Sequence, residues 1–167
     1  MEIREEKPCD AADIGKLNRR AFGGEAEGRL VDRLRAEGVT IASLVAMVDG
    51  KLAGHILFSE VVIETGPGSV RATSLAPMAV CPELQRRGIG SALVRRGLEI
   101  CRNNGYAIAI VVGHTGYYPR FGFSPEKAKA LRSPFAGPAF MALEFTPGAL
   151  EGIAGTVIYP PAFSIFD

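Results

Sequence analysis

Residues 82–93 read PELQRRGIGSAL, and this stretch decides the fold. Strand-like apolar residues lead into it, and an amphipathic helix leads out of it. Gly88 and Gly90 let the main chain come close to a ligand, and the first turn of a helix leaves backbone N–H groups without intrahelical partners. These N–H groups, the positive end of the helix dipole and the cations Arg86 and Arg87 together predict a site for a phosphate.

The pattern on both sides of this turn predicts an α/β fold with a mixed, largely antiparallel sheet. Before the turn, three strands follow one another, and the Asp49-Gly50 pair indicates a tight hairpin between the first two. After the turn, a helix with an apolar stripe leads to a continuous apolar run, which is typical of a strand covered on both faces in a parallel pairing. Strand, phosphate turn, helix and buried strand thus form one right-handed βαβ unit.

The expected elements cover most of the chain. Strands are expected over residues 3–6, 41–48, 51–64, 70–80, 106–112, 139–145 and 156–163, and helices over residues 10–21, 25–36 and 88–103. The apolar stripe of the last helix consists of Ile89, Leu93, Val94, Leu98 and Cys101. A short helical turn is expected within residues 116–122.

Prolines interrupt two of the expected strands. Pro77 lies in the third strand of the meander and lacks the N–H that a ladder hydrogen bond needs, so we expect an irregularity or an unpaired edge there. Pro160 and Pro161 lie within the last strand, and we expect them to confine part of it to an edge.

Three classes of phosphate turn differ in the residues that they require. A P-loop needs GxxxxGK[ST], which does not occur. A dinucleotide fingerprint fails because Leu93 stands where the third small residue should pack, and because residues 108–112 offer no acid for a ribose. The third class is the pyrophosphate turn of the GNAT acetyltransferases, Q/R-x-x-G-x-G/A, and residues 85–90 (QRRGIG) match it in full.

The resemblance to the GNAT family extends beyond the turn. Residues 75–82 (LAPMAVCP) are similar to the family's fourth strand and its exit, and residues 118–123 (YPRFGF) match its Y-x-x-x-G-F ending after the fifth strand. Residues 112–113 and 117–123, with the terminal YPPAF of residues 159–163, look like the bacterial YhbS-type N-acetyltransferases. The resemblance implies a single acetyltransferase domain over residues 1–167, with splayed parallel strands forming an acetyl-CoA cleft.

This resemblance also implies which residues form the site. The amides around the turn would hold the pyrophosphate of acetyl-CoA, the main chain of the preceding strand would contact the pantetheine arm, and the N–H of Val80 would polarise the thioester carbonyl. Tyr118 would be the general acid for the departing thiolate. The implied cofactor-binding residues are Met78, Ala79, Val80, Gln85, Arg86, Arg87, Gly88, Ile89, Gly90 and Ser91.

Each of these roles has a structural alternative. Arg86 and Arg87 could be solvated charges at a helix start, and Tyr118 could be a core aromatic that covers the sheet. Tyr117 is interpreted as a packing or cofactor-contact residue. The asparagine that many relatives place after the fifth strand is missing here, since residues 113–116 read GHTG.

The general base is left open. Glu60, Glu83 and His114 are candidates, and deprotonation of the amine through water would need no residue at all. Cys81 lies near the expected cofactor path and is interpreted as a buried thiol rather than a catalytic one.

Bulk properties limit the partners. The 167 residues are 47% hydrophobic and carry a net charge of about +1 without a block of like charge, so neither a nucleic acid nor a membrane is expected as the main partner. Cys9, Cys81 and Cys101 are odd in number, which indicates a reducing, cytoplasmic location. No metal is expected. The acceptor would be a primary amine of a small molecule, a protein N-terminus or a lysine, and a homodimer stays open.

An enzyme is one of two function classes that the pattern allows. A non-catalytic acyl-CoA-binding sensor or interaction module could keep the same fold. The complete glycine pattern and the presence of Tyr118 favour an acetyltransferase.

Overall fold

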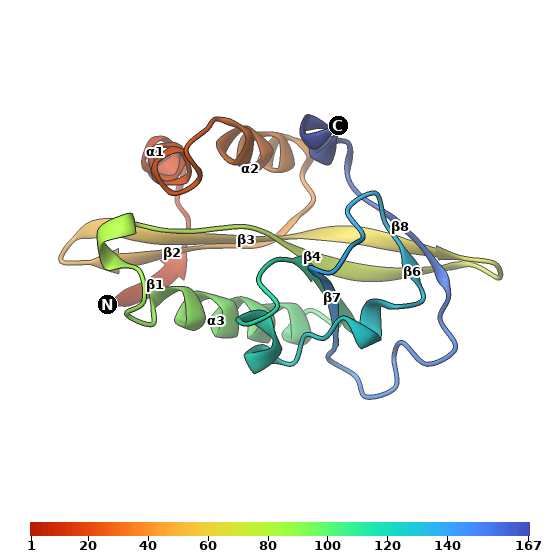
Figure 1. Cartoon of the computed structure of the whole chain (residues 1–167). Coiled ribbons are helices and arrows are strands. Elements are labelled where there is room, and N and C mark those ends of the chain that lie inside the picture. Colours follow the sequence, from red (N-terminus) through yellow and green to blue (C-terminus); the bar gives the residue numbers. More distant parts are fainter.

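An eight-stranded sheet separates two layers of helices in the computed structural model, which describes residues 1–167 (Figure 1). Helices α1 (Ala11–Phe22) and α2 (Ala26–Glu37) cover one face together with a C-terminal 3₁₀ helix (Pro161–Phe166), and α3 (Ile89–Asn103) covers the other. No helix combines the length and the apolar character that crossing a bilayer needs.

The sheet is mixed and mostly antiparallel, as the sequence predicts. Its main order is β1-β2-β3-β4-β5-β7, in which only β4 and β5 run parallel, and β8 pairs with both β3 and the short β6. The strands are β1 (Glu2–Glu5), β2 (Thr40–Val48), β3 (Lys51–Thr65), β4 (Ser69–Val80), β5 (Ile108–Val112), β6 (Leu131–Arg132), β7 (Phe140–Glu144) and β8 (Gly155–Ile158).

Most of the expected elements are confirmed. The β2–β3 hairpin turns at Asp49 and Gly50, whose φ angles of 51° and 74° are those of the tight turn that an Asp-Gly pair favours. The apolar stripe of α3 is buried against the sheet, where it packs with Phe58 and Ile56. On the other face, α1 and α2 bury Ile14 and Leu30 in a second core.

The predicted end of the C-terminal strand is wrong. It ends at Ile158 rather than at residue 163, because Pro160 leaves the sheet and Pro161 begins a 3₁₀ helix. Proline suits the first position of a helix, where no N–H donor is needed, and therefore Pro160 and Pro161 end the strand instead of forming its edge. The two-residue β6 carries too little pattern to be predicted from the sequence.

Pro77 lies at the expected irregularity. Strand β3 pairs Ile56 with Met78 and Phe58 with Leu75, so Leu57 alone lies opposite two residues of β4. This extra residue is a β-bulge, which bends the strand that carries it. The bulge lies where β4 separates from β5.

A buried histidine in the central strands predicts a pH-dependent stability. His55 of β3 is completely buried, its Nε2 lies 2.9 Å from the hydroxyl of Ser43, and its Nδ1 has no partner. Burial lowers the pKa of His55 to about 4; the nearby Glu6 raises it and Arg35 lowers it further. In the unfolded chain His55 therefore binds a proton with a pKa near 6.5, whereas in the folded protein it stays neutral until the pH falls toward 4.

We expect the free energy of unfolding to fall by about 2 kcal/mol between pH 7.5 and pH 5, with this contribution intact above pH 6.5 and lost as the pH falls toward 4. Urea unfolding of the wild type and of His55→Gln, which keeps an amide for Ser43, measures it. The wild type should show the steeper slope between pH 7 and 5. Equal slopes in both proteins would contradict the assignment.

Candidate active site

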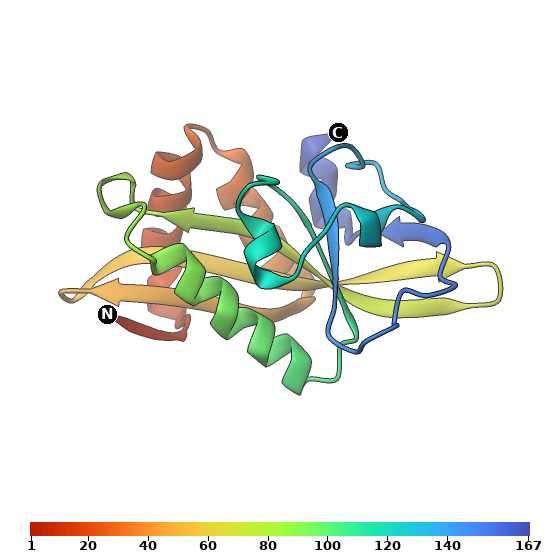
Figure 2. The same ribbon diagram turned by 60° about the horizontal axis from the view of Figure 1, so that its bottom comes forward.

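Strands β4 and β5 separate after a short parallel contact. They pair only between Thr73–Leu75 and Ala109–Val111, after which β4 continues to Val80 while β5 ends at Val112 (Figure 2). Beyond Leu75, the side of β4 that faces β5 therefore has no strand partner. This gap is the splay between the two parallel strands that the resemblance to the GNAT family implies.

The main chain at the end of β4 alternates between β3 and this gap. The N–H of Cys81 donates to the carbonyl of Ala53 at 2.8 Å, and Val80 lies opposite Gly54 in the same register. Hydrogen-bonded and non-bonded pairs alternate along an antiparallel ladder, so the N–H and C=O groups of Val80 and Met78 point away from β3 into the gap. The main chain of Ala79 instead pairs with β3.

The turn before α3 has the geometry of an anion site. Gly88 adopts the left-handed region with φ 87°, and Arg86 also has a positive φ of 65°. The backbone N–H groups of residues 88–91 donate to no acceptor in the protein. The side-chain amide of Gln85 donates to the carbonyl of Val80 at 3.2 Å and thereby ties the turn to the end of β4.

A cleft of about 720 Å³ lies between this turn and the end of β4, and we call it the α3 cleft. Eight of the predicted cofactor-binding residues line it: Met78, Val80, Gln85, Arg86, Gly88, Ile89, Gly90 and Ser91. Sequence reasoning did not include Leu84, Gly116 and Arg120, which line it as well.

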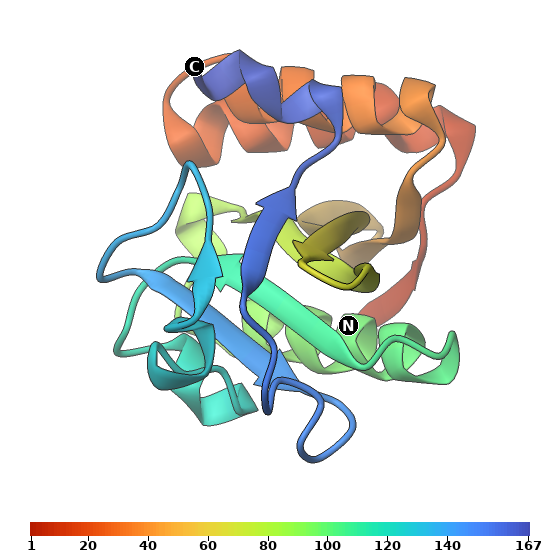
Figure 3. The same cartoon turned by 90° about the vertical axis from the view of Figure 1, so that its right-hand side faces the viewer.

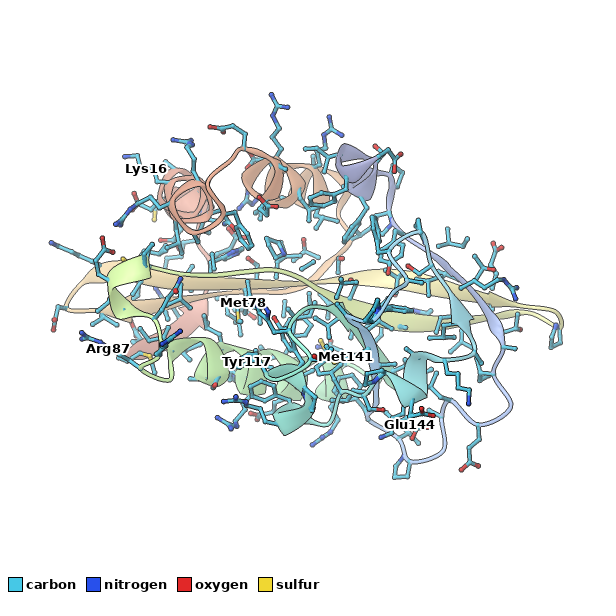
Figure 4. The ribbon with its side chains drawn as sticks, viewed as in Figure 1. Lys16, Met78, Arg87, Tyr117, Met141 and Glu144 are labelled. Atoms are coloured by element: carbon cyan, nitrogen blue, oxygen red, sulfur yellow. The ribbon has the colours of Figure 1, made fainter.

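Ala79 and Arg87 are not brought to the α3 cleft. The side chain of Ala79 is buried and its main chain faces β3, since alternate residues of a strand point in opposite directions. Arg87 is exposed at the end of the molecule, apart from Met78 and Tyr117 (Figure 4). For Arg87 this geometry favours a solvated charge at a helix start.

Gly90 faces the α3 cleft between two side chains. A Cβ at this position would lie 3.3 Å from the hydroxyl of Tyr117 and 3.4 Å from Cε of Met78. The same tyrosine hydroxyl lies 2.9 Å from the hydroxyl of Ser91. Any side chain at position 90 would therefore enter the cleft.

Tyr118 lies deeper than Tyr117. Its ring is buried, packs edge-on against Tyr117 and Phe123, and covers Gly113 so closely that a Cβ there would overlap it. The hydroxyl makes no hydrogen bond within the protein. Burial, with a smaller contribution from Tyr117, raises the pKa of Tyr118 to about 12.

An inner cavity adjoins the α3 cleft, and an outer cavity adjoins the inner one. The inner cavity, of about 340 Å³, shares Met78, His114 and Tyr117 with the cleft and is also lined by Tyr118. The outer cavity, of about 400 Å³, lies on its other side. The residues that line both cavities are Glu27, Leu75, Ala76, Val112 and Phe166. The three spaces therefore follow one another from the turn of α3, through the gap between β4 and β5, to α2.

The three candidate bases lie in different places. Glu60 accepts hydrogen bonds from Tyr106 and Arg71 at 2.7 and 2.6 Å, which lower its pKa, and it lines none of the three spaces. Glu83 pairs with Arg20 outside them. His114 lines both the α3 cleft and the inner cavity.

The carboxylate that does face these spaces is Glu27, which sequence reasoning missed. It lies in the first turn of α2 and lines the inner and outer cavities. Its only signal in the sequence was an acidic residue in the first helical turn after the Gly23-Gly24 loop. No group of three or more His, Cys, Asp or Glu side chains suited to a metal ion is present.

Comparisons with known proteins give one family and one full-length relative. Residues 2–125 match the family model of the acetyltransferase (GNAT) domain. The chain is 35% identical over 169 aligned positions to the uncharacterized N-acetyltransferase YhbS of Escherichia coli K12, covering 99% of this chain and 100% of the relative.

Two solved structures are also similar along the whole chain. One is E. coli YhbS in complex with CoA, with a TM-score of 0.90 and 34% identity over 99% of this chain and 93% of the other. The second is a GNAT family acetyltransferase from Brucella melitensis in complex with acetyl-CoA, with a TM-score of 0.81 and 36% identity over 97% of each chain.

Proposed function

The chain belongs to the GNAT acetyltransferase family, and from this premise we propose that it transfers an acetyl group from acetyl-CoA to a primary amine by direct attack in a ternary complex. The observation that carries the proposal is the row of spaces that runs from the turn of α3 through the gap beside Val80 and Tyr118 to α2. A donor that enters at α3 and an acceptor that enters at α2 would meet between the splayed strands.

The residues of the α3 cleft fit coenzyme A. The unpartnered N–H groups of residues 88–91 and the guanidinium of Arg86 supply donors and positive charge for a diphosphate. The main-chain groups of Met78 and Val80 that face the gap supply the pattern of a strand edge, which suits the amide groups of a pantetheine arm. The similar structures from E. coli and B. melitensis hold CoA and acetyl-CoA, which supports this assignment.

Acetyl-CoA supplies an acyl group activated as a thioester. Two hydrogen-bond donors of the protein would then act on this thioester. The N–H of Val80 would donate to the carbonyl oxygen and stabilise its developing charge. The hydroxyl of Tyr118 would donate to the sulfur. Because its pKa of about 12 exceeds that of an ordinary thiol, about 8.5, Tyr118 would stabilise the thiolate by a hydrogen bond rather than by full proton transfer.

Of the three candidate bases, His114 is the one best placed to accept the proton of the amine. It lines the space where donor and acceptor would meet, while Glu60 and Glu83 are engaged elsewhere. A water held there would serve equally well. We also propose that residues 1–167 form one acetyltransferase domain, because a single sheet contains strands from both ends of the chain. We propose a cytoplasmic location, because the cysteines are odd in number and widely spaced.

The proposal predicts two measurable properties. Calorimetric titration should show one acetyl-CoA site per chain, and a thiol-release assay should show amine-dependent formation of free CoA. Tight binding without thiol release on any amine of a broad panel would favour the sensor instead. Absence of binding would refute both readings.

A further inference from the structure

Four aromatic side chains are among the ten residues that line the outer cavity. Phe135 and Tyr159 meet edge-on with ring centroids 4.9 Å apart, and Phe163 and Phe166 lie 6.1 and 6.3 Å from Phe135. Rings at these separations and angles make favourable aromatic contacts. The cavity beside them is lined mainly by apolar side chains.

The position of these rings is fixed by contacts outside the cavity. The N–H of Ala162 donates to both carboxylate oxygens of Glu37 at 2.8 and 3.1 Å, which holds the C-terminal 3₁₀ helix alongside α2 (Figure 3). The hydroxyls of Tyr159 and Ser133 lie 3.1 Å apart. The aromatic wall is therefore built into the fold.

Exposed apolar side chains gather at the same place. Phe22, Val112 and Phe166 are 46%, 48% and 41% exposed, and each lines the inner or the outer cavity. Large apolar side chains left in water around a hollow mark a surface that binds an apolar ligand.

Glu27 is the single charged residue in the wall of the outer cavity, and it is the single carboxylate in the wall of the inner one. Its side chain is half-buried and makes no hydrogen bond or ion pair within the protein. The carboxylate keeps part of its contact with water and is available to pair with a cationic group of a ligand. The cavities thus combine one negative charge with a large aromatic surface.

We propose that the outer cavity takes the acceptor, and that the acceptor is a primary amine with a single positive charge on an aromatic body, its ammonium group paired with Glu27. This inference rests on the proposed acetyl transfer and names the substrate class of that site. Polyamines carry several positive charges, and the two cavities together offer only one carboxylate to pair with them, so a polyamine fits this site poorly. An extended acyl chain of the donor would leave Glu27 without a partner.

The test compares probe amines under saturating acetyl-CoA. The wild type should release thiol with a higher kcat/KM on 2-phenylethylamine than on hexylamine, spermidine or a peptide with a free α-amine. Glu27→Gln should raise KM for 2-phenylethylamine roughly 10- to 100-fold with little change in kcat, because a hydrogen bond to a charged group is lost. Its affinity for acetyl-CoA should stay unchanged.

Two further variants separate the parts of the inference. Glu25 lies next to the start of the same helix, pairs with Arg19 and lines neither cavity. The KM of Glu25→Gln for 2-phenylethylamine should therefore equal that of the wild type. Phe166→Ala removes a partly exposed ring and should reduce the preference for 2-phenylethylamine over hexylamine.

A binding measurement keeps this inference distinct from the proposed activity. Calorimetric titration of 2-phenylethylamine into the CoA-bound wild type and into CoA-bound Glu27→Gln should show binding that the substitution weakens. Such binding without any turnover would refute acetyl transfer and leave the amine site standing. Turnover that favours spermidine or the peptide, or a Glu27→Gln variant equal to the wild type in KM and in binding, would overturn the inference.

Discussion

Gly90→Glu is expected to abolish acetyl-CoA binding, with at least a roughly 1,000-fold rise in Kd. The new Cβ would lie against Met78 and the hydroxyl of Tyr117, so the rest of the side chain has to extend into the α3 cleft. There its carboxylate would lie beside the N–H groups of residues 88–91 and compete with the diphosphate for them. Like charges placed together at a binding site cost several kcal/mol, and each 1.4 kcal/mol is tenfold in affinity.

Calorimetry with acetyl-CoA measures this effect, and Gly66→Glu is the matched control. Gly66 lies in the turn between β3 and β4, has an ordinary φ angle and has open space around it, so the same change there should leave Kd unaltered. Circular dichroism should show both variants folded. An unchanged Kd for a folded Gly90→Glu would mean that coenzyme A does not lie on this turn.

The turn of α3 could be predicted from the sequence because its determinants are local. A left-handed residue at Gly88, an open helix start and an apolar stripe at helical spacing all follow from neighbours in the chain. The same holds for the β2–β3 hairpin. The bulge at Pro77 was also predictable, since a missing N–H donor disturbs any ladder in which it stands.

Which residues of β4 face the cleft could not be predicted, because that depends on register. The resemblance to the family implies that residues 78–80 all lie near the donor. The pairing of Cys81 with Ala53 instead directs the main chain of Met78 and Val80 to the gap and that of Ala79 to β3. A shift of one residue would exchange these roles. Nothing within the strand itself selects between the two registers.

The acceptor side was harder still, because its parts are far apart in the chain. Glu27 meets Phe135, Tyr159 and Phe166 only after the C-terminal 3₁₀ helix docks on α2. Glu60, by contrast, looked suitable in the sequence and is engaged by Arg71 and Tyr106 outside the cavities. Which carboxylate faces the cavities depends on tertiary contacts, and the local sequence pattern does not encode these contacts.

Tyr118→Phe is expected to lower kcat roughly 10- to 100-fold while the Kd for acetyl-CoA stays within about twofold, as a hydrogen bond to a charged group that forms only during reaction is lost. The hydroxyl has no protein partner to lose, and the ring contacts with Tyr117 and Phe123 would remain. Single-turnover thiol release and calorimetry measure the two quantities separately.

Tyr117→Phe is the matched control, since it removes a hydroxyl from the adjacent ring. That hydroxyl lies beside Ser91 in the α3 cleft, so its loss should change the affinity for acetyl-CoA more than kcat. The opposite pattern, with kcat falling in Tyr117→Phe and unchanged in Tyr118→Phe, would assign the sulfur contact to Tyr117.

The pH dependence of kcat adds an independent check on Tyr118. Its pKa is raised to about 12 because burial disfavours the phenolate, so the hydroxyl stays protonated throughout the range in which the protein can be assayed. Wild type and Tyr118→Phe should therefore differ by a constant factor between pH 6 and pH 10. The contrary result would be a decline of kcat below pH 10 in the wild type that is absent in Tyr118→Phe. It would show that Tyr118 loses its proton in this range, which contradicts its buried position. The inner cavity would then have to be open to water during turnover.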